Sequence, residues 1–154
     1  MTDDIWTPMP LIPWLPGGMT REEFEKQQEE QERLLADEFI ADVRRTVKQL
    51  EDYKKVSPRK GIWLFATDAI ECDDEWGSYY SYGLDVQGIY RFKDRAINLA
   101  IKYVKNIDFE YYKQIKEASQ SLCQYLYIEN YCGTRVVDSF YNWLTNTRVT
   151  RTHQ

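Results

Sequence analysis

The sequence is poor in the residue on which most acid–base and metal chemistry depends. Its 154 residues include one histidine, His153, which is next to last in the chain. Chain ends are often frayed, whereas a catalytic imidazole must be held in one orientation. The sequence therefore argues against a histidine metal site, a Ser–His or Cys–His dyad and an imidazole acid–base catalyst.

Cysteine and glycine are arranged in ways that exclude further classes. Cys72, Cys123 and Cys132 form no C-x-x-C pair, and an odd number of thiols cannot all pair within one chain. Gly83 and Gly88 are not followed by the Gly-Lys-Ser/Thr of a phosphate-binding loop. We therefore expect three structural thiols in a reducing compartment, no cofactor and no catalytic residue.

Long hydrophobic runs are also missing. The longest uncharged apolar stretch runs from Gly61 to Thr67, far short of the roughly 20 residues that cross a membrane. The chain begins Met1-Thr2-Asp3-Asp4, which is acidic where a targeting peptide would be basic. No membrane association is expected, and the predicted location is the cytoplasm.

Acidic charge is present in excess and is unevenly distributed. The formal net charge of −5 combines 20 bases with 25 acids. Residues 68–85 hold six acids and no base, and residues 20–53 hold eleven acids and six bases. Such a chain repels phosphate at long range, so direct binding to nucleic acid is not expected and a basic protein partner is favoured.

The first residues have the composition of an extended arm. Four of the five prolines lie in residues 1–19, and residues 10–16 carry proline at every third position, the repeat of a polyproline II helix. Trp6 and Trp14 make this arm too apolar for a solvated linker. We expect both tryptophans to pack on this chain, on a partner or on a second copy, so that a homo-oligomer is possible.

Helical spacing dominates residues 20–147, which we interpret as one domain followed by a flexible polar tail, residues 148–154. Thr20 and Glu23 form a capping box at the start of a long helix. Further helices are predicted after Ser57-Pro58, across residues 86–104, after Asp108 and from Thr134, with Gly133 as a stop signal. The sequence thus predicts a mainly α fold, a bundle of about five helices with an N-terminal Pro/Trp-rich arm.

Two segments keep a β alternative open. The run from Ile62 to Ala66 is apolar enough for a buried strand, and periodicity does not distinguish the two possibilities. Residues 78–82 and 88–92 are rich in tyrosine and could pair as a hairpin. The alternative is therefore an α+β fold with a small hairpin near residues 78–92.

Aromatic residues alternate with acids in the predicted loop between residues 73 and 85. Tyrosine and tryptophan offer large contact areas at low entropic cost, and neighbouring acids speed association with a basic partner. The candidate partner-binding residues are Asp73, Asp74, Glu75, Trp76, Tyr79, Tyr80 and Tyr82, with Trp6 and Trp14 of the arm. The main functional hypothesis is a non-catalytic interaction protein, such as a regulatory subunit, adaptor or inhibitor of a larger complex.

Two alternatives come from other classes of protein. Asp68, Glu71 and Asp73 could hold Mg²⁺ in a carboxylate-dependent enzyme, although no calcium-loop pattern accompanies them. Arg91, Arg95, Lys102 and Lys105 could form a basic stripe on one helix in an accessory subunit of a nucleoprotein complex.

Overall fold

The chain divides into two compact units, residues 1–38 and residues 39–154. The computed structural model describes residues 18–153, with side chains for residues 18–147. Trp6, Trp14 and the other residues of the predicted arm through residue 17 lie outside the described residues.

The first unit contains the beginning of α1 (Arg21–Lys54). The Thr20 hydroxyl accepts a hydrogen bond from the Glu23 amide at 3.2 Å, which confirms the predicted N-cap. Ion pairs such as Arg33–Glu30 at 2.6 Å join neighbouring turns of this polar stretch. Local signals are sufficient to place this helix start.

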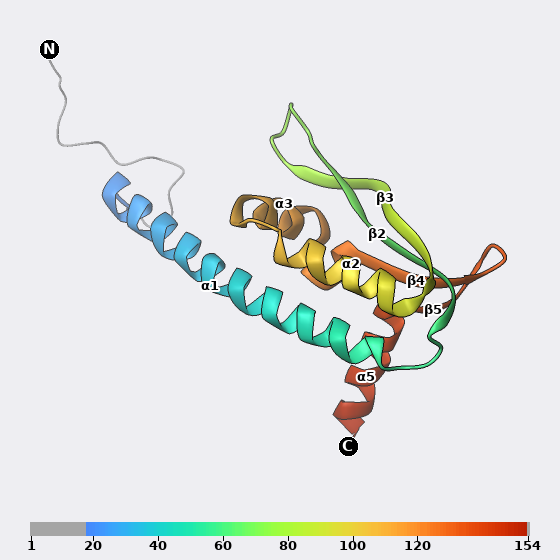
Figure 1. Cartoon of the computed structure of the whole chain (residues 1–154). Coiled ribbons are helices and arrows are strands. Elements are labelled where there is room, and N and C mark those ends of the chain that lie inside the picture. The colour runs from blue at the N-terminus through green and yellow to red at the C-terminus, as the bar shows by residue number, and fades with distance from the viewer. Residues whose placement is uncertain (1–17, 154) are drawn as a thin grey trace, which may run out of the picture. The chain divides into compact units, whose positions relative to one another are not determined.

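The second unit contains a four-stranded antiparallel sheet and several helices, which contradicts the predicted helical bundle (Figure 1). The sheet has the order β3-β2-β4-β5. After the C-terminal part of α1, the elements are β2 (Lys60–Cys72), β3 (Tyr79–Phe92), α2 (Lys93–Lys105), α3 (Phe109–Ser119), α4 (Leu122–Tyr125), β4 (Leu126–Cys132), β5 (Arg135–Ser139) and α5 (Phe140–His153). The backbone of α5 thus continues through residues that the sequence assigned to a polar tail.

The expected helix across residues 62–70 is wrong, because these residues form β2. Trp63 and Phe65 are fully buried on one face of the strand. On the other face, Leu64 lies opposite Ile89 of β3. A short run of apolar residues suits a strand as well as it suits a helix, so the periodicity did not distinguish the two. The strand alternative for this segment is confirmed.

The helix expected across residues 86–104 is wrong in its first turns. Val86 and Ile89 belong to β3, which pairs along its length with β2. The helix α2 starts at Lys93 and buries Ala96, Ile97, Ala100 and Val104 as its spacing predicted. The alternative hairpin of residues 78–82 against 88–92 is also wrong, since both segments lie in this one strand.

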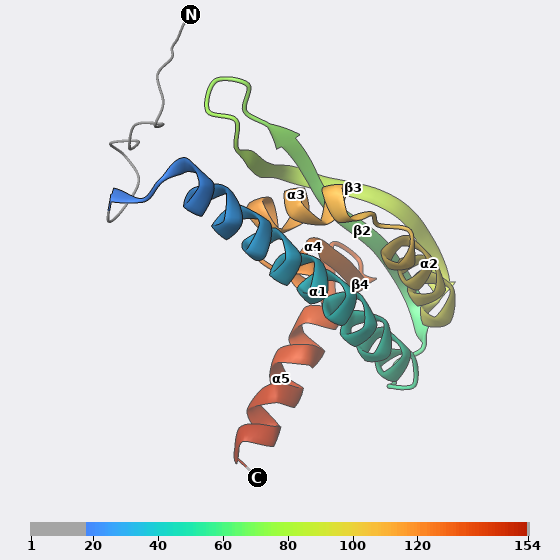
Figure 2. The same ribbon diagram turned by 90° about the vertical axis from the view of Figure 1, so that its left-hand side faces the viewer.

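Three bulges interrupt the pairing of the two long strands. Gln87 is an extra residue on β3, because Phe65 and Ala66 of β2 lie opposite Gly88 and Val86. Tyr82 is extra in the same way, opposite the step from Ala69 to Ile70, and the third shift lies between Lys60 and Trp63 of β2. Bulges increase local twist. In the two views the pair forms a long curved ribbon (Figures 1 and 2).

Two further helix starts were misplaced. Ser57-Pro58 precedes β2 and caps no helix. Thr134 leads into β5, and Gly133, with φ of 65°, forms the turn between β4 and β5 and ends no helix. Asp108 was placed correctly, since its carboxylate accepts a hydrogen bond from the Tyr111 amide at 2.8 Å. A turn glycine ends a helix or joins two strands equally well.

The core of the second unit lies between the helices and one face of the sheet. Helices α2 and α3 pack on the same side of the β2–β3 ribbon (Figure 2). Tyr53 of α1 packs against Trp63, Phe140 and Trp143, with ring centroids 5.2–6.0 Å apart. This aromatic cluster joins α1, the sheet and α5.

Candidate functional site

The turn between β2 and β3 contains the densest group of predicted binding residues. Asp73 organises it: one carboxylate oxygen accepts the amide hydrogens of Glu75 at 2.9 Å and of Trp76 at 3.3 Å. The Asp73 amide and carbonyl also bond to Ser78 and Gly77 across the turn. Gly77 has φ of 69°, the left-handed conformation that glycine adopts without strain. The turn is therefore a hydrogen-bonded cap on two long strands.

Large aromatic side chains are exposed at this end of the ribbon. Trp76 is 78% exposed, Tyr82 63% and Tyr80 44%. Asp74 and Glu75 beside them are also exposed. We call Asp73, Asp74, Glu75, Trp76, Tyr80 and Tyr82 the acidic–aromatic tip.

Tyr79, at the start of β3, has a different role from its neighbours. Its side chain is half-buried, and its amide donates a hydrogen bond to the Glu117 carboxylate at 2.5 Å. This bond joins the base of the tip to α3. Tyr79 therefore supports the tip more than it extends the exposed surface.

Negative charge continues from the tip into the strands. The Tyr80 hydroxyl lies 3.4 Å from the Glu71 carboxylate. The negative charge of Glu71 raises the pKa of the Tyr80 hydroxyl above its ordinary value, because it disfavours a phenolate. Asp85 lies farther along β3, where its carboxylate accepts a hydrogen bond from Gln87 at 3.1 Å.

The alternative magnesium ligands are not gathered into one cluster. Asp68 is buried on β2, Glu71 is exposed on the same strand and Asp73 is engaged with the turn. Among the described residues, no group of three or more His, Cys, Asp and Glu side chains is arranged to hold a metal ion.

The predicted basic stripe is divided between two elements. Arg91 lies in β3, so its expected place on the same helix as the other bases is wrong. Arg95, Lys102 and Lys105 are exposed on α2. The neighbouring Lys93, by contrast, is buried.

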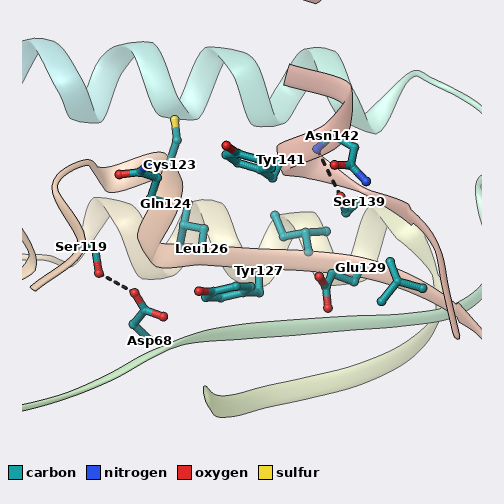
Figure 3. A pocket seen from close by; sticks show the side chains of 12 residues that line it. Asp68, Ser119, Cys123, Gln124, Leu126, Tyr127, Glu129, Ser139, Tyr141 and Asn142 are labelled. Atoms are coloured by element: carbon teal, nitrogen blue, oxygen red, sulfur yellow. Dashed lines mark hydrogen bonds between the residues drawn. The ribbon is translucent and has the colours of Figure 1, made fainter. Parts of the chain in front are cut away.

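A cavity of about 520 Å³ beside β4 was not predicted (Figure 3). Asp68 and Ser119 lie at one end, Ser139 and Asn142 at the other, and Tyr127 lies between them (Figure 3). The remaining lining residues are Cys123, Gln124, Leu126, Ile128, Glu129, Val136 and Tyr141. They come from six elements between residues 68 and 142, so no local pattern marks them. The one available signal was the position of Tyr127 and Glu129 on the same face of an alternating segment.

Hydrogen bonds fix the polar groups of this cavity. The Asp68 carboxylate accepts a hydrogen bond from the Ser119 hydroxyl. Glu129 accepts from the Tyr131 hydroxyl at 2.6 Å. Ser139 accepts from the Asn142 amide at 3.1 Å and so caps α5.

None of the three described cysteines forms a disulfide, and they lie apart in the fold. Cys123 is buried, Cys72 is half-buried and Cys132 is exposed. Cys123 donates to the side-chain oxygen of Gln49 at 3.3 Å.

The comparisons with known proteins give no family for this chain. No protein-family model, curated protein or solved structure matches it. Within residues 18–153, none of the helices combines the length and apolar character that a bilayer crossing requires.

Proposed function

We propose that the protein is a non-catalytic interaction protein that docks its acidic–aromatic tip on a basic surface of another protein. The observation that carries this proposal is the exposure of Trp76, at 78%, among carboxylates at the end of a long ribbon. An indole exposed to water is a surplus of apolar area that a partner would bury. A regulatory subunit, adaptor or inhibitor is the matching class.

Acids and aromatics in the tip would have separate tasks. Asp74 and Glu75 would draw a basic partner toward the tip and increase the association rate, which salt would reduce. Trp76 and Tyr82 would slow dissociation by burying ring area in the complex. Association and dissociation therefore report on different residues.

Asp73 should not be substituted in a test of the tip, because it has a structural role that the other acids lack. Its carboxylate holds two amides of the turn, so replacing it would alter the conformation of the tip along with its charge. The informative variants keep Asp73 and change its exposed neighbours.

The test is quantitative capture of a partner from the native source, with the partner identified and then purified. The double substitution Asp74→Ser with Glu75→Ser should lower the association rate about tenfold at low salt and much less at 0.5 M salt. Trp76→Ala should raise the dissociation rate at both salt concentrations, with a loss of about 2 kcal/mol in binding free energy.

A matched control removes the same charge elsewhere. Glu29→Ser with Asp37→Ser changes two exposed carboxylates of α1. Association slowed equally by both double variants would show that only net charge matters, and unchanged binding by Trp76→Ala would remove the tip as the contact.

The cytoplasmic location belongs to the same proposal. Three cysteines that form no disulfide, one of them exposed, suit a reducing compartment. Oxidation of Cys132 during purification in air would be the practical sign of that preference.

A further inference from the structure

The cavity beside β4 combines polar groups with an apolar surface. Asp68, Tyr127 and Glu129 supply the polar groups, while Val136 of β5 supplies an exposed apolar side chain. Val136 and Tyr141 are exposed, which places the cavity in reach of solvent. A cavity of this size and mixed lining is typical of small-molecule sites.

The charges of this lining are unbalanced. Two of its residues are carboxylic acids, and none of the twelve lining residues is lysine, arginine or histidine. The Asp68 side chain is nearly buried, and its hydrogen-bond partner Ser119 is neutral. A carboxylate in a poorly solvated place is stabilised strongly by a cation. The lining therefore lacks a positive charge that a ligand could bring.

The two carboxylates are separated along the sheet. Glu129 pairs with Leu64 of β2, four residues before Asp68 on the same strand. At roughly 3.3 Å per residue, the backbone positions of the two acids lie about 13 Å apart. The Tyr127 ring lies between them (Figure 3). One small cation would reach only one of the acids, whereas an extended molecule with a charge at each end would reach both.

We propose that this cavity binds a free aliphatic polyamine. One terminal ammonium would pair with Asp68 and the other with Glu129, and the methylene chain would cover Tyr127 and Val136. A cation beside the Tyr127 ring would gain a further attraction to its face. This site is independent of the acidic–aromatic tip, and either could exist without the other.

Burial first, and then the neighbouring Asp68 and Glu129 carboxylates, raise the pKa of the Tyr127 hydroxyl to about 12. The two carboxylates on either side of this ring would attract an ammonium group.

Titration calorimetry of the full chain at 0.15 M salt tests the site, with spermidine as the probe. Spermidine should bind with one-to-one stoichiometry, the shorter putrescine more weakly, and fully N-acetylated spermidine not at all. Glu129→Gln should reduce spermidine affinity about tenfold, because one charged hydrogen-bond acceptor is lost. Glu29→Gln, which removes the same charge from the exposed surface of α1, should change affinity less than twofold.

A second variant covers the case in which Glu129→Gln does not fold. Val136→Lys adds a positive charge at an exposed position of the lining and should abolish spermidine binding. A cooperative thermal unfolding transition should show that this variant is folded. Equal losses in Glu29→Gln and Glu129→Gln, or equal affinity for putrescine and spermidine, would overturn the proposal. So would absence of spermidine binding, or binding of a lysine-rich peptide in preference to spermidine.

Discussion

Lys93 is a fully buried lysine in the core of the second unit. Its ammonium donates to the Val56 carbonyl at 2.6 Å and lies 3.6 Å from the centre of the Tyr53 ring. These contacts do not replace water completely, and burial lowers the pKa of Lys93 to about 8. Single side chains of this kind make the fold sensitive to pH.

The substitution Lys93→Met tests how the unfolding free energy depends on pH through Lys93. The pKa of Lys93 is lower in the folded chain than its ordinary 10.5, so between pH 8 and 10.5 the unfolded chain binds more protons. Stability contributed by this group therefore rises with pH in that window. The unfolding free energy of the wild type, minus that of Lys93→Met, should increase by about 2 kcal/mol from pH 7 to pH 9.5 in urea titrations. Parallel pH profiles would show that Lys93 does not lose its proton.

Asp42 is a buried acid whose carboxylate has two hydrogen-bond donors beside it. It accepts hydrogen bonds from the Tyr112 hydroxyl at 2.9 Å and from Arg45 at 2.5 Å. Asp42→Ala removes the acceptor from a buried hydroxyl, which should lower the unfolding free energy by about 2 kcal/mol. Chemical denaturation measures the loss, and Asp37→Ala on the exposed surface of the same helix should cost less than about 0.5 kcal/mol.

At the scale of elements, the sequence was informative where structure is local. The Thr20 and Asp108 caps and the buried positions of α2 could be predicted, because a cap or a helical face involves residues within a few positions of each other. The strands could not be predicted in the same way. The apolar run of β2 forms a strand because β3 and β4 pair with it on either side. Composition alone marked the residues of the tip, but the loop expected over residues 73–85 is wrong from Tyr79 onward, where β3 begins. The cavity was missed because its walls meet only after the sheet has formed.

Gly61 shows how closely β2 and β4 approach. Its φ is 141°, and a Cβ at this position would overlap the side-chain amide of Asn130. Gly61→Ala should therefore destabilise the fold by about 3 kcal/mol, from backbone strain and the steric overlap together.

Gly77→Ala is the matched comparison for this prediction. Gly77 also has positive φ, but a Cβ there would meet no atom within 4 Å. It should cost about 1 kcal/mol, the strain of the left-handed conformation alone. Equal losses in urea denaturation would contradict the proposed overlap with Asn130.

At the scale of the whole molecule, the buried residues that the structure describes all belong to the second unit. The first buried residue of the described chain is Asp42, and the buried apolar residues run from Leu50 to Leu144. The first 18 residues of α1, from Arg21 to Glu38, are polar or exposed for the most part. Stability should therefore be held almost entirely by residues 39–154.

Two shortened chains test this division, one beginning at residue 18 and the other at residue 31. Their unfolding free energies should agree within about 1 kcal/mol, because residues 18–30 include no buried side chain. Circular dichroism during urea denaturation provides the measurement. A much less stable chain, or a broad transition, on loss of residues 18–30 would show that these residues contribute to the core.

The bulges of β3 have a consequence for self-association. A straight edge strand of this length, with Val86 and Ile89 exposed, would be a template on which identical chains could stack into fibrils. The extra residues Tyr82 and Gln87 interrupt the regular row of outward-facing amides and carbonyls. These bulges therefore make the exposed edge of β3 a poorer template for strand pairing with a second copy of the chain.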